Sequence, residues 1–153
     1  KAAENSCRIL APSLEDHGIS MELKLGAEVY VSGYPNEYAQ VVLNLMSNAK
    51  DALIKRKVAQ PRIEISVGDN QGNAELRVSD NAGGIAEELL PKVFEPYFTT
   101  KEMGGLGLYM SKLIIENNMG GQILAANHGD GAAFLISCPL VRGEDRTISP
   151  SSN

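Results

Sequence analysis

The feature that most constrains the fold is a set of short segments in which apolar and polar residues alternate. Four of them form two pairs, and a short turn of polar and glycine residues separates the members of each pair. Such alternation predicts strands with one buried face, and a tight polar turn between two of them predicts a β-hairpin. Strands are expected at residues 19–25, 28–32, 62–68, 74–79, 122–127 and 132–138, the last four as the two hairpins.

Helical patterns lie between these strands. Residues 35–59 are expected to form a long helix, because Pro35 fits the first helical turn and Pro61 ends the segment. Residues 106–118 have a shorter helical periodicity, which the glycine pair at 120–121 ends. Hairpins separated by helices predict an α+β fold, in which helices pack on one face of a mixed, mainly antiparallel sheet as a two-layer sandwich.

The remaining segments have no regular pattern. Residues 1–16 lean towards helix and are expected to break at Pro12, so we interpret them as a lead-in segment from a preceding helical domain. Residues 80–105 form a long connection rich in glycine and proline, which is typical of a functional or mobile loop. One domain is expected at residues 17–141, followed by a flexible tail at residues 142–153.

Composition excludes some classes of partner. The 153-residue chain has a net charge of −5, which argues against a phosphate backbone as its main partner because such backbones are bound by clustered Lys and Arg, so no nucleic acid partner is expected. No segment approaches the roughly 18 apolar residues needed to cross a bilayer, so no direct membrane contact is expected. We therefore expect a cytoplasmic location, and the sequence leaves open whether the parent protein is membrane-anchored.

Two further observations concern the context of the chain. Cys7 and Cys138 lack the spacing of a metal site and are expected to be free thiols in a reducing compartment, with one long-range disulfide between them left open. The chain begins with Lys1 rather than Met, which predicts that it is a piece of a longer protein, and the expected cytoplasmic location agrees with the lack of a charged-then-apolar leader.

The long helix expected at residues 35–59 carries two different faces. Its apolar face is expected to pack on the sheet through Val42, Leu45, Met46, Ala49 and Leu53. A second, narrow stripe holds Glu37, Asn44, Asn48 and Asp51. Because Asn is a mediocre helix former, two Asn in register predict a line of oxygen ligands facing a cleft, which would suit Mg²⁺. The alternative is that these amides satisfy backbone groups of neighbouring loops.

The segment VSDNAGGI places Asp80 at the end of a strand and two glycines shortly after it. Such a carboxylate can accept a hydrogen bond from the exocyclic amine of a base, while Gly83 and Gly84 leave room for a flat ring against the backbone. The alternative is an ordinary turn after a strand, where Asp, Asn and Gly are common.

The segment GGLGL at residues 104–108 leads into the second predicted helix. Free N–H groups at a helix start, with glycines that permit close approach, make an anion site. Lys101 lies just before it and could reach a phosphate as a point charge. The segment is not a Walker A loop, because no GKS or GKT follows, and no strand precedes it as in a dinucleotide-binding loop.

Taken in order, NEYAQVVLNLMSNAKDAL, DNAGGI, VFEPYFTTK, GGLGL and GDGAAF resemble the N, G1, F, G2 and G3 boxes of the histidine-kinase ATP-binding domain. This domain belongs to a superfamily shared with DNA gyrase, MutL and the large heat-shock chaperone. The match covers residues 17–141, and the DAL and PYFTTK runs are closest to the nitrogen-regulator type of sensor kinase. The resemblance implies a Bergerat-type sandwich with a mobile ATP lid at residues 86–104.

The resemblance also assigns roles by position. It implies ATP and Mg²⁺ as cofactors, with Asn48 as the metal ligand and Asn44 and Lys101 as the catalytic residues beside the phosphates. The implied nucleotide-binding residues are Asn48, Asp51, Asp80, Gly84, Ile85, Phe94, Thr99, Thr100, Gly104, Gly105, Leu106, Gly107 and Leu108. Phe94 and Phe98 would anchor the lid to the core.

Several positions depart from the family pattern. Ala82 replaces the first glycine of the Asp box, Met103 and Gly104 precede GLGL where Gly and Thr are usual, and Tyr109 replaces a common Ser. Ala132 and Ala133 replace a turn that carries Ser or Thr. These losses put the fine geometry of the lid and phosphate contacts in doubt, but they leave Asn48 and Asp80 unchanged.

The resemblance implies transfer of the γ-phosphate to a histidine on a separate helical dimerisation and phosphoacceptor domain, with a response regulator as an indirect partner. Asn44 stands where hydrolytic relatives have a Glu that activates water, and an amide cannot take that proton. His17 and His128 lie outside a helix with a following acid and are expected to be structural. The alternatives are a Ser/Thr kinase of the same superfamily, or a degenerate domain that binds nucleotide or only a protein partner.

Overall fold

The structure is a computed structural model that describes residues 2–26, 34–96 and 107–140. The strand expected at residues 28–32 and the tail expected at residues 142–153 lie outside the described residues.

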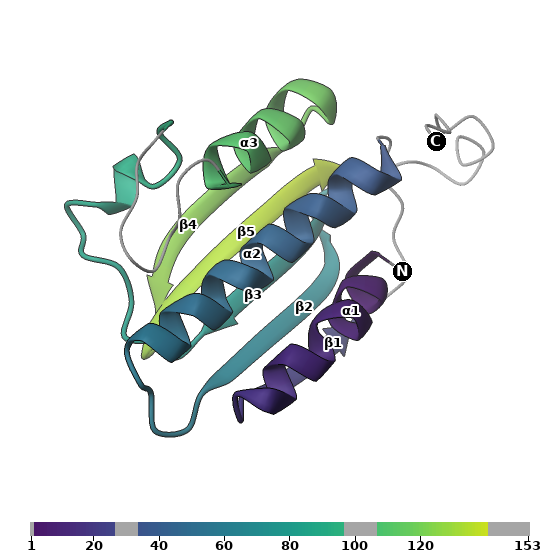
Figure 1. Cartoon of the computed structure of the whole chain (residues 1–153). Coiled ribbons are helices and arrows are strands. Elements are labelled where there is room, and N and C mark those ends of the chain that lie inside the picture. The colour runs from purple at the N-terminus through teal and green to yellow at the C-terminus, as the bar shows by residue number, and fades with distance from the viewer. Residues whose placement is uncertain (1, 27–33, 97–106, 141–153) are drawn as a thin grey trace.

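A single five-stranded sheet organises the described chain (Figure 1). The strands are β1 (Ser20–Leu25), β2 (Arg62–Asn70), β3 (Asn73–Asp80), β4 (Gln122–His128) and β5 (Gly131–Pro139). Their order across the sheet is β1-β2-β3-β5-β4, where β1 pairs with β2 in parallel and every other pair is antiparallel. The predicted α+β class and both predicted hairpins are confirmed.

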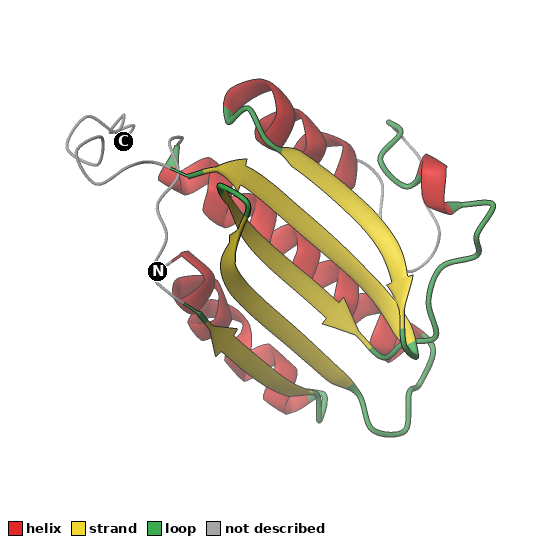
Figure 2. Ribbon diagram, turned by 180° about the vertical axis from the view of Figure 1, so that it is seen from behind, coloured by secondary structure: helices red, strands yellow, loops and turns green. Residues whose placement is uncertain are grey.

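The helices are α1 (Ala2–Asp16), α2 (Pro35–Lys55), the 3₁₀ turn η1 (Leu90–Lys92), α3 (Gly107–Leu113) and the π-helical segment η2 (Ile114–Asn118). Seen from the two sides, α1, α2 and α3 lie on one face of the sheet, as predicted, and the other face is open (Figures 1 and 2). Within the described residues, no helix has both the length and the apolar character to span a bilayer.

The core lies between α2 and the covered face of the sheet. The predicted apolar arc of α2 is confirmed, since Val42, Leu45, Met46, Ala49 and Leu53 are all buried. They meet alternate residues of the strands: Ile63 and Ile65 from β2, Leu76 and Val78 from β3, Ile123 from β4, and Phe134 and Ile136 from β5. Apolar residues repeat about every 3.6 residues on α2 and every second residue on the strands. The helix therefore has one apolar stripe and the sheet one apolar face, and the two pack together.

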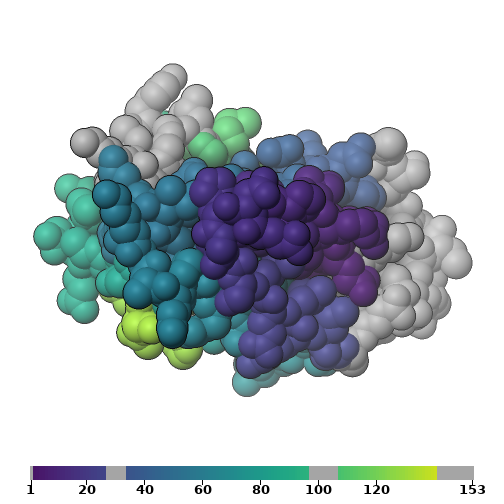
Figure 3. Space-filling model, turned by 60° about the horizontal axis from the view of Figure 1, so that its bottom comes forward, coloured from purple at the N-terminus to yellow at the C-terminus, as the bar shows by residue number. Residues whose placement is uncertain are grey.

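The prediction that the first helix breaks at Pro12 is wrong. α1 continues through Pro12 to Asp16, and Leu14 beyond the proline is buried. Proline removes one backbone donor, but packing on both sides of Pro12 outweighs that loss, because Ala3 and Cys7 are buried before it. Lys50 of α2 also donates a hydrogen bond of 2.9 Å to the Ser13 hydroxyl. Figure 3 shows α1 lying beside β1 at this end of the molecule.

One predicted helix ends earlier than its pattern indicates, and the other reaches its predicted end with a change of hydrogen bonding. α2 ends at Lys55 rather than at residue 59, because Lys57 adopts a left-handed φ of 53°. The second helix keeps α-helical hydrogen bonding only to Leu113 and continues as the π-helical η2 to Asn118. The Gly121 N–H then donates to the Ile115 carbonyl at 2.9 Å, which closes this end.

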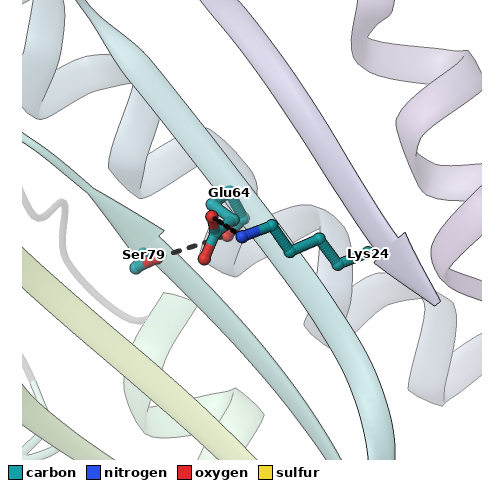
Figure 4. A network of polar contacts seen from close by, with 3 residues as sticks. All are labelled: Lys24, Glu64 and Ser79. Carbon is teal, nitrogen blue, oxygen red and sulfur yellow. Dashed lines mark hydrogen bonds and ion pairs between the residues drawn. The ribbon is translucent and has the colours of Figure 1, made fainter. Parts of the chain in front are cut away.

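Over β1, β2 and β3 the open face of the sheet is polar, so this part of it needs no second helical layer. Lys24 on β1 forms an ion pair of 2.9 Å with Glu64 on β2, and the Ser79 hydroxyl on β3 donates to the Glu64 carbonyl at 3.5 Å (Figure 4). The pair raises the pKa of Lys24 and lowers that of Glu64, in both cases chiefly through their hydrogen bond. Polar residues therefore take the positions that alternate with the core residues.

Adjacent positions of α2 test this arrangement. Leu53 is 2% exposed and Ile54 is 38% exposed. Replacing Leu53 with Ala leaves a cavity and should lower the free energy of unfolding by about 2–5 kcal/mol. Ile54→Ala is the matched control and should cost less than about 1 kcal/mol, since much of that side chain already contacts water. Urea denaturation measures both, and equal losses would contradict the assignment of the buried face.

Candidate functional site

Asp80 ends β3 and is held by the loop and the hairpin on either side of it. Its Oδ1 accepts hydrogen bonds from the Ala82 N–H at 2.9 Å and from the Ala132 N–H at 3.3 Å. Burial raises the pKa of this carboxyl, the two backbone donors and the Arg56 charge oppose the rise, and Asp130 adds to it. Within the described residues no group donates to Oδ2, so one carboxylate oxygen keeps its accepting capacity.

Side chains from outside residues 82–85, which we call the glycine loop, hold that loop in place. Nη1 of Arg56, just after α2, donates to the carbonyls of Ala82 and Gly84, each at 2.8 Å. Asn127, near the end of β4, pairs both atoms of its amide with the backbone of Ile85. The loop conformation therefore depends on residues distant in the sequence.

Two glycines in this region are required by geometry. Gly84 has a φ of +85°, and a Cβ there would lie 2.8 Å from the Asn127 Oδ1. Gly131 begins β5 directly against the end of β3, where a Cβ would overlap the Asp80 carbonyl. No other residue type fits either position without movement of the backbone or of Asn127.

Asn44 brings the polar stripe of α2 against the start of α3. Its Nδ2 donates to the buried Ser111 hydroxyl at 3.2 Å, and its Oδ1 accepts a bond of 3.4 Å from Gln40. The Gly107 position, at the first residue of α3, is also close, since a Cβ there would lie 3.9 Å from the Asn44 Cγ. The structure thus places two of the predicted site residues side by side.

Asn48, one turn further along, differs from Asn44. Its Nδ2 is buried and has no hydrogen-bond acceptor within the described part of the chain. A buried donor without a partner costs about 1–3 kcal/mol, so a ligand group that supplied the acceptor would be favoured. The alternative reading, in which this amide serves a neighbouring backbone group, finds no support in the contacts of its Nδ2.

Asp51 and Glu37, at the two ends of the polar stripe, make fewer contacts than Asn44 does. Asp51 is exposed, and no hydrogen bond or ion pair to it is found among the described residues. Glu37 accepts a hydrogen bond of 3.0 Å from Asn118 in η2, which links the start of α2 to the end of the α3–η2 segment.

Phe94 is attached to the core, as its predicted anchoring role requires. Its ring meets that of Phe134 edge-on, with centroids 6.1 Å apart. Lys112 of α3 lies over the same ring, with Nζ 5.6 Å from the centroid, and pairs with Glu116 at 2.8 Å. The segment after the glycine loop is therefore packed on both β5 and α3.

The other predicted site residues fall into two groups. The side chains of Ile85 and Leu108 are buried in the core, and the backbone N–H and carbonyl of Ile85 are both bonded to Asn127. Phe98, Thr99, Thr100, Lys101, Gly104, Gly105 and Leu106 lie outside the described residues.

Sequence reasoning missed three residues that organise this region: Arg56, Ser111 and Asn127. Asn127 was interpreted as part of a strand leading into a turn, and Arg56 as part of a longer helix. Each contacts a segment at least 26 positions away, and such pairs leave no local pattern in one sequence.

The arrangement suits an extended, polyfunctional ligand better than a metal ion alone. It offers a carboxylate acceptor beside a glycine loop, and amides beside the start of a helix. No group of three or more His, Cys, Asp or Glu residues that could hold a metal ion by itself occurs in the described ranges.

Comparison with known proteins identifies the family. Residues 33–142 match the model of the histidine kinase-, DNA gyrase B- and HSP90-like ATPase family. The two-component sensor PprA of Pseudomonas aeruginosa is 40% identical over 149 residues, which cover 91% of this chain and 16% of that protein. The sensor histidine kinase ZraS of Escherichia coli is 35% identical over 107 residues, which cover 69% of this chain and 22% of that protein.

Solved structures agree with this assignment. The nucleotide-free catalytic domain of histidine kinase ThkA has a TM-score of 0.79 at 28% identity, with 90% of both chains covered. ThkA in complex with the response regulator TrrA has a TM-score of 0.75 at 26% identity, covering 92% of this chain and 40% of that one.

The family match spans most of the chain, and the sequence relatives and solved structures agree with it. The chain therefore belongs to the histidine kinase-, DNA gyrase B- and HSP90-like ATPases, and within them to the ATP-binding catalytic domains of the histidine-kinase type.

Proposed function

We propose that this domain binds Mg-ATP and donates the γ-phosphate to a histidine on a separate helical dimerisation and phosphoacceptor domain of a sensor kinase. The phosphate would then pass to a response regulator in the cytoplasm. The observation that carries the proposal is Asp80, a partly buried carboxylate with one oxygen held by the backbone and the other available beside a glycine loop. The chain spans less than a quarter of the sensor kinases it matches, so the acceptor belongs to the rest of the protein.

Asp80 would recognise adenine. Its Oδ2 would accept a hydrogen bond from the exocyclic amine, while the ring would lie against Gly84. The same atom would select against guanine, because guanine presents a carbonyl oxygen where adenine presents the amine, and two acceptors repel. Phe94 would hold the start of the lid segment through its contacts with Phe134 and Lys112.

Asn48 would hold Mg²⁺ through its side-chain oxygen. Amide oxygens are hard ligands of the kind that Mg²⁺ accepts alongside water and phosphate. The unpaired Nδ2 of Asn48 supports this placement, because a phosphate oxygen would supply its missing acceptor. The ion would neutralise charge on the phosphates. Asn44 would lie beside the phosphates with Gly105 and Gly107, and Lys101 would approach the terminal phosphate, as the family pattern implies.

The described residues also bear on the choice between transfer and hydrolysis. At Asn44 an amide replaces the Glu expected of a hydrolase, and its nitrogen is already bonded to Ser111. An amide cannot accept a proton from water, so this position activates no nucleophile. In transfer, a histidine nitrogen of the partner attacks the γ-phosphorus and ADP leaves, and this chain contributes positioning and charge neutralisation.

The first prediction concerns base recognition. Asp80→Asn removes the charge of the acceptor and should weaken ATP binding about 10- to 100-fold, since a hydrogen bond to a charged group contributes about 1.5–3 kcal/mol. Titration with a fluorescent ATP analogue measures this, and circular dichroism checks that the fold persists. Unchanged affinity would mean that the base does not bind at Asp80.

The second prediction concerns stability in the absence of ATP. The pKa of Asp80 is raised from its ordinary value of 3.8, so the folded state holds this proton more tightly than the unfolded chain does. Its contribution to stability is therefore lost as pH rises from about 4 through the raised pKa, and above that pH the ionised group is a net cost. Asp80→Asn should melt at or above the wild-type temperature at pH 7, and this advantage should shrink towards pH 4. A variant that melts well below wild type at pH 7 would contradict the assigned sign.

The third prediction concerns the reaction. Labelled ATP mixed with this domain and the helical acceptor domain of its own parent should give acid-labile phosphate on the acceptor and little free phosphate. Acid-stable phosphate would instead indicate the Ser/Thr kinase alternative. A steady ATPase rate of the isolated domain that Asn44→Ala abolishes would contradict transfer as its function, and failure to bind Mg-ATP at millimolar concentration would indicate a degenerate interaction domain.

A further inference from the structure

Asn127 lies on a different element from every residue assigned to ATP above, yet its side chain is bonded to the glycine loop. We propose that Asn127 is a positioning residue that fixes this loop relative to Asp80, and that the preference of the site for adenine over guanine depends on it. The inference rests on the proposed function and concerns how its base specificity is maintained.

The contact is a complete pairing of two groups. The Ile85 N–H donates to the Asn127 Oδ1 at 2.7 Å, and the Asn127 Nδ2 donates to the Ile85 carbonyl at 2.7 Å. The Asn127 amide thus bonds to Ile85 as the backbone of a neighbouring strand would, and it satisfies both the N–H and the carbonyl of Ile85. Among natural side chains only Asn and Gln supply one donor and one acceptor in this planar geometry, and Gln is one methylene longer.

This contact lies next to the residue that is proposed to contact the base, so its loss would affect base recognition. Ile85 follows Gly84, the residue proposed to lie against the ring, and the Asn127 Oδ1 lies 2.8 Å from where a Cβ on Gly84 would be. Moving the Ile85 backbone would therefore move Gly84 relative to Asp80. Selection of adenine requires that separation to be fixed, since the ring and its amine must fit both at once.

Other contacts between the β4–β5 hairpin and the loop show that Asn127 completes a larger attachment. The Gly83 N–H donates to the Asp130 carbonyl at 2.9 Å, and the Ala132 N–H donates to the Asp80 Oδ1 at 3.3 Å. The first contact holds Gly83 within the loop, and the second holds Asp80 just before it. Within the described residues only Asn127 joins this hairpin to the backbone of Ile85, so its loss releases Ile85 from the hairpin, while Arg56 still holds the Gly84 carbonyl.

Asn81 provides an internal comparison. Its amide makes the same kind of double pairing, accepting from the Arg62 N–H at 2.8 Å and donating to the Gln60 carbonyl at 2.8 Å. That pairing attaches the segment after Asp80 to the start of β2. The two amides therefore hold opposite ends of the loop, Asn81 on β2 and Asn127 on β4, with the proposed base contact between them.

The test compares three ligands on the whole chain: Mg-ATP, Mg-GTP and inorganic tripolyphosphate, by calorimetry. Asn127→Ala leaves both polar groups of Ile85 without their partner and should weaken ATP binding about 10-fold, the size expected from two lost hydrogen bonds partly replaced by water. The affinities for GTP and tripolyphosphate should change less than about threefold, since neither depends on the fit between Gly84 and Asp80. The ratio of ATP to GTP affinity should therefore fall.

Ile123→Val is the matched control, because Ile123 is a core residue of the same strand, β4. It should lower the melting temperature while leaving the ATP to GTP ratio unchanged. Equal losses for all three ligands in Asn127→Ala would overturn the inference and leave only a structural role for this residue. An unchanged ATP affinity would overturn it as well. If the wild-type chain failed to bind Mg-ATP, the proposed function would be the part that is wrong.

Discussion

The burial of the Asp80 carboxylate is the constraint on which the organisation of this region depends. A partly buried negative charge at the end of β3 requires donors, and it takes them from the loop after it and from the start of β5. The bond from Ala132 can form only because Gly131 lets the two strand ends approach, where any Cβ would overlap the Asp80 carbonyl. The charge, the glycine and the antiparallel pairing of β3 with β5 are therefore parts of one arrangement.

α2 connects this arrangement to the rest of the molecule. One of its faces packs on the sheet, and another places polar side chains near the candidate site. Its apolar arc covers the sheet and supplies much of the core, while its polar stripe brings Asn44 to α3 and leaves the Nδ2 of Asn48 unpaired. Just beyond its end, Arg56 holds the carbonyls of the glycine loop. The packing that stabilises the fold thus also fixes where the polar groups stand, and the site is placed on rigid elements rather than on loops alone.

The elements that a single sequence could predict are those with a local period. The hairpins, the buried arc of α2 and the polar stripe all follow from spacing within one segment, and Val42 and Leu53 lie in the core as their positions on the wheel indicate. Prediction failed where distant packing decided the outcome. α1 passes through Pro12 because residues on either side of it are buried, which the local propensity of proline does not reveal. Asn127 and Arg56 were missed for a related reason, since their partners are backbone atoms, which leave no residue-type signature in the sequence.

Two features of the described residues act against the stability of the fold, and both lie at the proposed nucleotide site. Burial makes the ionised form of Asp80 costly, and Asn48 keeps a buried donor without an acceptor within the described residues. A nucleotide relieves both at once if its exocyclic amine meets Asp80 and a phosphate oxygen meets Asn48. Folding has already removed water from Asp80 and Asn48, so ATP binding would not have to bear that cost again. In this sense the site would be preorganised.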